Sequence, residues 1–193
     1  GREFGAEGHE IGKELADRIG FTLYDKDMLA IAAQKSGIDI NVLAHEDESY
    51  SGHALSPYLT IGRLSKSMGD KLFRLQTDII HDLAAKGSCI IVGRLGDYIL
   101  KDNPNCLKAF IYAPFEKRVE IIKNKHGISE GEAKKLVKKM DTARREYYTY
   151  YSNGKWDRKE GKDILLNRAT FGIEGCVNIL EAMARSMDPA IGK

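Results

Sequence analysis

The stretch GREFGAEGHEIG, residues 1–12, decides how this sequence folds. Gly1, Gly5 and Gly8 allow the backbone to turn sharply and to pass close to a bound group. The residues that follow, KELADRIG, have helical spacing, so a glycine-rich turn is predicted to open directly into a helix. Amide groups at a helix start attract anions, and the stretch is therefore a candidate phosphate-binding loop. A purely structural turn is the alternative.

The loop differs from the common phosphate loop GxxxxGK[ST], because His9 and Glu10 follow Gly8 where that pattern has lysine and a hydroxyl residue. The lysine is missing. Arg2, His9 or Lys13 could replace it in part, although Lys13 lies one turn into the helix and is expected to be solvated.

Composition limits the classes of protein to which the chain can belong. The 193 residues, 42% hydrophobic and 30% charged, predict one globular domain. A net charge of +2 argues against nucleic acid or an acidic membrane surface as the main partner. No apolar run approaches the length of a membrane span, and the three distant cysteines (Cys89, Cys106, Cys176) indicate neither a disulfide framework nor a zinc site. We therefore expect a cytoplasmic protein with reduced thiols and no membrane partner.

Strand and helix patterns alternate along the chain. Strands are expected at 21–24, 89–92, 107–113 and 163–167, and helices at 11–19, 25–37, 69–86, 114–126, 129–151 and 172–186. Residues 39–69 have no sustained period and predict short helices and loop. This alternation predicts an α/β domain whose parallel sheet is flanked by helices, with ligands at the carboxyl ends of the strands.

Five segments, in this order, resemble the cytidylate kinase-like family, relatives of the bacterial cytidine monophosphate kinases: GREFGAEGHEIGKELADRIGFTLYDKDML, GSCIIVGRLGDYIL, FIYAPFEKRVEII, KKMDTARREYYTYY and DILLNRATFGIE. The resemblance implies a three-layer P-loop kinase fold with a five-stranded parallel sheet and a helical lid. It implies one domain over residues 1–193, with a lid at about 126–160 and an acceptor-side insertion at about 38–69. The strand expected before the loop is absent from the start of the chain, so we expect the natural protein to begin several residues earlier.

The resemblance implies a phosphotransferase that uses ATP and Mg²⁺ and moves the terminal phosphoryl group to a nucleoside monophosphate such as CMP. The partners would then be small-molecule nucleotides. Two alternatives stay open: a nucleotide-binding regulatory module that has lost transfer, which the missing lysine would explain, and a kinase for a different small acceptor.

The resemblance also places the nucleotide contacts. By simple alignment, the positions of the missing lysine and hydroxyl are Gly8 and Glu10, and the residues expected to hold the ATP phosphates are Arg2, Gly5, Ala6, Glu7, Gly8, His9, Glu10 and Ile11. Asp25, Arg94 and Asp97 are expected on the acceptor side. The tyrosine and arginine that usually follow the family's acceptor aspartate are not found after Asp25. The alternative for Arg94 is that it caps a helix and pairs with Asp97.

Four arginines are the catalytic candidates: Arg94, Arg118, Arg144 and Arg145. Arg144 is similar to the lid arginine that neutralises charge on the transferred group, and Arg118 to the one that faces the donor nucleotide. The alternatives are a surface ion-pair ladder of Asp141, Arg144 and Arg145, and a solvated Arg118. Packing between lid and core, or between subunits, is the expected role of most of the tyrosines at 147, 148, 150 and 151.

The other candidate groups indicate no metal site. The five histidines (His9, His45, His53, His81, His126) lack the spacing of metal ligands. The acidic run from His45 to Glu48 could attract a divalent ion, but it is more typical of a solvated loop. No protein metal ligand is therefore predicted.

Overall fold

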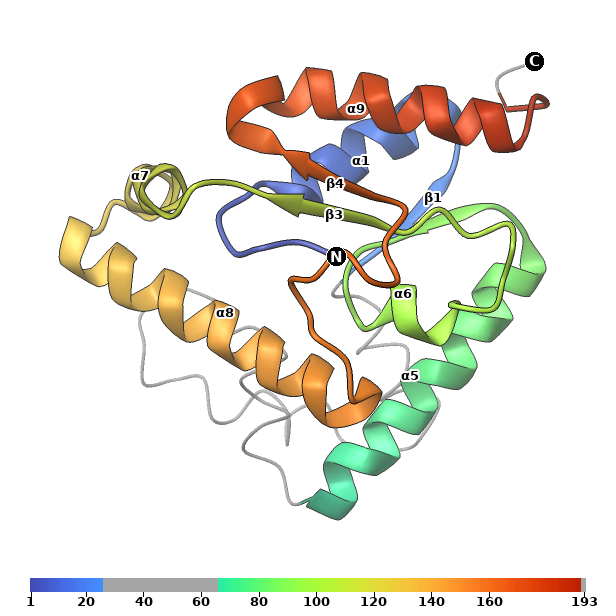
Figure 1. Ribbon diagram of the computed structural model, residues 1–193, viewed down its shortest axis with the longest axis horizontal. Helices are drawn as coiled ribbons and strands as arrows, with labels where there is room; N and C mark the ends of the chain where they lie inside the picture. Colours follow the sequence, from blue (N-terminus) through green and yellow to red (C-terminus); the bar gives the residue numbers. More distant parts are fainter. Residues whose placement is uncertain (26–65, 192–193) are drawn as a thin grey trace.

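A computed structural model describes residues 1–25 and 66–191 of the chain. In these ranges four strands form two parallel pairs, β1 (Thr22–Tyr24) with β2 (Cys89–Ile91) and β3 (Ala109–Tyr112) with β4 (Ile164–Asn167). All four overlap the strands predicted from the sequence. The mixed α/β class with parallel strands is thus confirmed (Figure 1).

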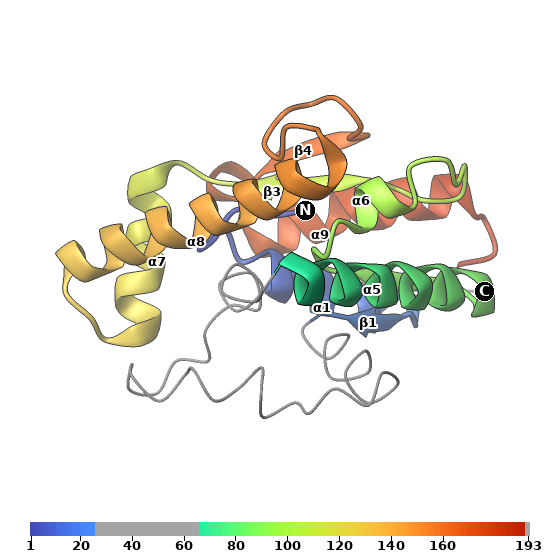
Figure 2. The same cartoon turned by 90° about the horizontal axis from the view of Figure 1, so that it is seen from below.

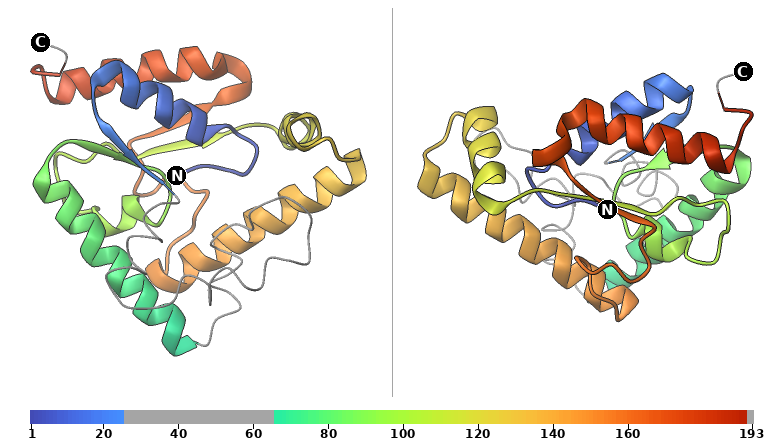
Figure 3. Two further views of the ribbon diagram at one scale, coloured as in Figure 1. Left: turned by 180° about the vertical axis from the view of Figure 1, so that it is seen from behind. Right: turned by 45° about the horizontal axis from the view of Figure 1, so that its top comes forward.

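Six helices are described in the same ranges: α1 (Gly8–Ile19), α5 (Lys66–Lys86), α6 (Gly96–Ile99), α7 (Phe115–His126), α8 (Glu130–Ser152) and α9 (Arg168–Met187). Helices α1 and α9 pack together on one side of β3 and β4, and α5, α6 and α8 lie on the other side (Figures 1 and 3). The predicted helix at 25–37 and nearly all of the insertion at 38–69 lie outside the described residues.

Helix α9 begins four residues before the predicted start at 172. The Asn167 side chain accepts a hydrogen bond from the amide of Ala169, 3.1 Å away, and so caps a first turn that the sequence pattern did not reveal. Gly172 then departs from helical geometry with φ 68° and ψ −179°, and the remainder of the helix follows. Arg168 therefore belongs to a separate first turn at the carboxyl end of β4.

The single continuous sheet implied by the resemblance is present as two pairs, because no strand of the described residues lies between β2 and β3. Residues at the chain start run along β3 only briefly: Arg2 bridges Ile111, the amide of Glu3 donates to Ile111 O at 3.0 Å, and the amide of Ile111 donates to Gly1 O at 3.0 Å. A cavity of about 610 Å³ lies between the pairs, bordered by β2, β3, α1 and α9.

Three apolar clusters hold these layers together. One joins α1 and α9 to β3 and β4 and includes Ile11, Ile111 and Val177. A second joins α5, α6 and α8 and includes Leu72 and Ile80. The third joins α7 to the first half of α8 through Val119, Ile122, Ala133 and Val137.

The two halves of α8 have different neighbours. Its first turn carries a capping box in which the Ser129 hydroxyl accepts from the amide of Glu132, and this end packs against α7, away from the sheet (Figure 2). Near its other end Tyr151 stacks on Phe73 of α5 with ring centroids 4.0 Å apart. The predicted packing role of the tyrosines is confirmed for this residue, whereas the lid assignment for residues 126–160 stays a prediction.

Candidate functional site

The glycine loop, residues 1–8, leads into α1 through left-handed backbone at two positions. Gly5 has φ 82°, and Glu7, the N-cap of α1, has φ 55°. The Glu7 side chain makes no capping hydrogen bond, so it does not occupy the amides of the first turn. These amides at the helix start have the geometry that favours an anion.

Steric crowding explains why position 8 holds a glycine rather than a lysine. A Cβ atom at this position would lie 2.7 Å from Cβ of Arg2, closer than real Cβ contacts, and the contacting atom is next to the backbone. A lysine here would therefore require the loop to move. The positive charge that a phosphate needs must come from another residue.

Arg118 and Asp141 attach the glycine loop to α7 and α8. The amide of Phe4 donates to Asp141 Oδ1 at 2.8 Å, and Arg118 Nη1 donates to Phe4 O at 3.0 Å and to Asp141 Oδ2 at 2.5 Å. Arg118 is only 6% exposed, and its Nε lies 3.0 Å from Oε2 of Glu3. Burial raises the pKa of Glu3, although the Ala113 amide and Arg118 act against this. The solvated alternative for Arg118 is wrong.

Arg144 also faces the loop. Its Nη1 donates to Arg2 O at 3.1 Å, and its guanidinium lies 5.4 Å from the centre of the Phe4 ring. The surface ladder with Asp141 is wrong, because Asp141 is buried and pairs with Arg118. Arg145 is exposed and pairs with Asp157 at 3.3 Å.

Residues from three segments line one small cavity behind the loop. Arg2, Arg94, Asp97 and Arg144 surround it together with Gly1, Gly93, Leu95, Tyr148 and Trp156. Arg94 follows β2 with φ 55° and is 1% exposed. The cavity volume is about 20 Å³, enough for a single water molecule, so a phosphate group could enter only if its walls moved.

Asp97 is held by a buried lysine that the sequence analysis missed. Lys162, whose side chain has no exposed area, places Nζ 2.7 Å from Oδ2 of Asp97, and the Tyr148 hydroxyl donates to the same oxygen at 3.1 Å. Burial raises the pKa of Asp97, whereas Lys162 and Tyr148 lower it, and the pKa lies below its ordinary value. Lys162 and Tyr148 are thus two partners that hold this carboxylate, and the alternative in which Arg94 pairs with Asp97 stays open.

Asp25 joins the end of β1 to the loop. Its Oδ1 accepts from Arg2 Nη2 at 3.2 Å, and its Oδ2 lies 2.7 Å from Nδ1 of His9. Asp25, Arg2 and His9, each predicted as a nucleotide contact, are thus brought together. Lys13 is exposed, as expected from the sequence.

Two further cations that the sequence analysis missed meet acidic residues at the start of α1. Lys125 Nζ lies 2.5 Å from Oε1 of Glu10, and Arg168 forms an ion pair with Glu7. Burial raises the pKa of Glu10, but Lys125 outweighs it and lowers the pKa below its ordinary value. The sequence contained no signal for these pairs, because the partners are more than 100 positions apart.

The model of the cytidylate kinase-like family matches residues 1–170, which include the glycine loop, the residues that line the small cavity behind it, and α8. The chain belongs to this family. No curated protein matches it.

Two solved structures are similar to the chain. An uncharacterized protein from Eubacterium ventriosum ATCC 27560 is 25% identical, with a TM-score of 0.73 over 96% of this chain and 95% of that one. TT1252 from Thermus thermophilus is 15% identical, with a TM-score of 0.53 over 96% of this chain and 94% of that one, and shows a likeness of fold alone.

In the described ranges, no helix is long and apolar enough to cross a membrane. Nor do residues 1–25 and 66–191 contain a group of three or more histidine, cysteine or acidic side chains placed to hold a metal ion.

Proposed function

We propose that the protein is a nucleotide-dependent kinase that transfers the terminal phosphoryl group of ATP to a nucleoside monophosphate such as CMP. Membership of the cytidylate kinase-like family supports this class of reaction. One structural observation supports it most: Arg94 and Arg144, 50 positions apart in the sequence, line the same cavity with Arg2, directly behind the glycine loop.

The three arginines suit the charge that phosphoryl transfer develops, provided that the walls of the cavity move to admit the transferred group. The bond from the terminal phosphorus to the bridging oxygen of ATP breaks, ADP leaves, and an oxygen of the acceptor phosphate forms the new bond to phosphorus. Charge spreads over the transferred group, and catalysis consists mainly of positioning and electrostatic stabilisation. Buried arginines provide fixed, bidentate donors for this purpose.

Two features of the described residues fit ATP and Mg²⁺. The uncapped start of α1 would receive the phosphates, and Glu10 in its first turn offers a carboxylate, a ligand type that Mg²⁺ accepts together with substrate phosphates. When bound, the metal would neutralise phosphate charge. Asp25 and Asp97 are proposed to position the acceptor, and Arg118 to hold the loop against α7.

A coupled assay of ADP formation with Mg²⁺, ATP and a panel of nucleoside monophosphates tests the proposal. We expect turnover with at least one acceptor, and Arg144→Ala should lower kcat about 100-fold to 1,000-fold, since arginines that stabilise the transferred group contribute effects of this order or more. Lys139→Ala, an exposed residue of the same helix, is the matched control and should stay within about twofold. Arg145→Ala should have an effect between these two.

The regulatory-module alternative is favoured by one observation, the steric exclusion of lysine at Gly8. If ATP binds by calorimetry while no acceptor in the panel gives turnover above the Arg144→Ala background, transfer to a nucleoside monophosphate is rejected, and the binding module is the better description unless an acceptor outside the panel is phosphorylated. A kinase for another acceptor would show turnover only outside the monophosphate panel.

A further inference from the structure

The ion pair between Glu7 and Arg168 connects the glycine loop to α9. Glu7 comes from the last turn of the loop, and Arg168 is the first residue of α9, directly after β4 ends. Both side chains are partly exposed, at 19% and 25%. This ion pair lies at the carboxyl edge of the strands, where the loop also lies, and both side chains keep part of their surface exposed there, although Oε2 of Glu7 and Nε of Arg168 are themselves buried.

The loop carries a negative charge where a phosphate is expected. Gly8 contributes no cation, and the preceding Glu7 contributes a carboxylate that does not cap α1. A carboxylate in this position would repel a phosphate unless a nearby cation neutralised it. Arg168 is that cation.

Arg168 has hydrogen-bonding capacity beyond this carboxylate. A guanidinium has five N–H donors in a rigid fork, suited to two anions at once. The Nε atom of Arg168 is buried and has no hydrogen-bond acceptor in the described part of the chain. The residue is also fixed to the core, because Asn167 caps its turn and α9 packs along α1.

Other cations beside the loop are less suited to this role. Arg118 is buried among Asp141, Glu3 and two backbone carbonyls. Lys125 is 55% exposed near the end of α7, where an ammonium group acts as a solvated point charge.

We propose that Arg168 contacts the phosphate groups of the nucleotide in place of the absent loop lysine, and that Glu7 competes with those phosphates for its guanidinium. This inference rests on the proposed function, because it assumes that the glycine loop receives a nucleoside triphosphate. It makes Arg168 a binding residue and Glu7 a residue that limits affinity.

Opposite effects of two substitutions test this role. Arg168→Met should weaken binding of ATP and of inorganic tripolyphosphate about 10-fold to 100-fold in calorimetry, as expected for a lost charge-assisted hydrogen bond. Arg168→Lys should recover part of this loss. Glu7→Gln keeps the shape and the backbone preference but removes the competing charge, and should strengthen binding about threefold to tenfold.

A double variant provides the decisive control. The gain from Glu7→Gln should disappear in the Arg168→Met background, because the competition acts through that guanidinium. Arg185→Met removes an arginine farther along α9 that pairs with Glu181, and its affinity should match wild type.

A merely structural ion pair would give a different pattern, in which both single substitutions weaken binding or neither changes it, and this would overturn the inference. If wild type turns over a nucleotide while Arg168→Met binds like wild type, the inference fails and the proposed function stands. If the opposite effects appear with tripolyphosphate but no acceptor is phosphorylated, the inference stands and the kinase fails. Absence of any phosphate binding by wild type rejects both.

Discussion

The ion pairs at the start of α1 and those along α8 differ in how far their side chains are exposed to solvent. At the start of α1, Glu7 forms an ion pair with Arg168, and Glu10 forms one with Lys125. Each of these four side chains is at least 19% exposed. Along α8 and its neighbours, Asp141 forms an ion pair with Arg118, and Asp97 forms one with Lys162. None of these four side chains is more than 11% exposed. Both regions attach segments that are distant in the sequence.

The difference lies in what happens when a partner is removed. A partly exposed ion pair can exchange its partner for water or for a ligand at little cost. A buried pair cannot, because the remaining charge stays without solvent. The first region is therefore suited to exchange with phosphate, and the second to fixing α8 against the loop and α6.

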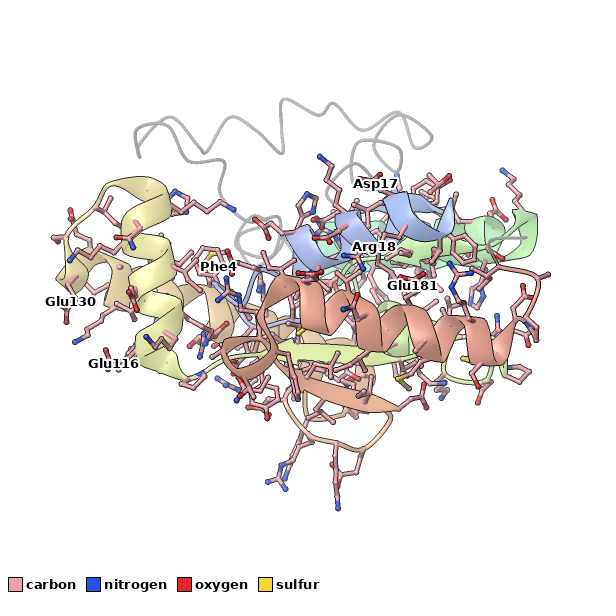
Figure 4. All side chains as sticks on the ribbon, turned by 90° about the horizontal axis from the view of Figure 1, so that it is seen from above. Phe4, Asp17, Arg18, Glu116, Glu130 and Glu181 are labelled. Atoms are coloured by element: carbon pink, nitrogen blue, oxygen red, sulfur yellow. The ribbon has the colours of Figure 1, made fainter. Side chains whose placement is uncertain are left out.

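The exposed ion pairs elsewhere on the surface resemble the first region. Lys134 pairs with Glu130 and with Glu116 at the outer end of the α7–α8 pair, and Arg18 of α1 pairs with Glu14 and with Glu181 of α9 (Figure 4). None of these lies at the glycine loop, so they provide matched controls for the predictions below.

The largest expected effect concerns the buried lysine. Lys162→Met should lower the free energy of unfolding by about 3 kcal/mol, because the substitution leaves Asp97 buried with its main cation removed. Urea denaturation measures it, and Lys134→Met, which removes an exposed pair, should cost less than about 0.5 kcal/mol. Equal losses in the two variants would remove the distinction between the regions.

The second effect is a dependence of stability on pH. The pKa of Asp97 is lower in the folded protein than its ordinary value, so its ionised form stabilises the fold. This contribution is present above the unfolded pKa of about 4 and is lost as the pH falls through the folded pKa. Denaturation of wild type between pH 3 and 6 should therefore show a steeper loss of unfolding free energy toward acid pH than Asp97→Asn does.

Glu3 is present in both wild type and Asp97→Asn, so its contribution to the pH dependence of stability cancels when the two proteins are compared. The pKa of Glu3 is raised, so its effect has the opposite sign, with stability lost as the pH rises through its folded pKa. Parallel pH profiles for wild type and Asp97→Asn would contradict a stabilising ionised Asp97.

The smallest effect concerns the ion pair at the glycine loop. Arg168→Met should change the free energy of unfolding by less than about 1 kcal/mol, because both side chains of the pair are partly exposed. The same urea denaturation provides the measurement. A loss as large as that of Lys162→Met would show that this pair is structural, and would argue against exchange with phosphate.

Local sequence patterns predicted most of the elements. The helical spacing from Leu72 to Leu83 gave α5, and Pro114 and Gly127 marked the limits of α7. The apolar run at 89–92 gave β2. These signals are local, so they can be read without knowing the neighbours.

The sequence predicted the candidate site in part. It brought forward the loop, Arg94, Asp97 and Arg144, and these residues do meet at one cavity. It gave no reason to select Lys162 or Arg168, because a lysine in KEGKDILL and an arginine after a strand are ordinary in isolation. Their significance depends on Asp97 and Glu7, which lie 65 and 161 positions away.

The sequence alone thus determined the alternation of strands and helices, the glycine loop and the absence of its lysine, since each depends on residues close together in the chain. Only the tertiary structure decided which charges are buried and which partners they have. It placed Arg118 in the interior, paired it with the buried Asp141, and made Gly8 necessary by bringing Arg2 against it. The physical reason is that solvation and partner choice are properties of the packed chain, and no local pattern encodes them.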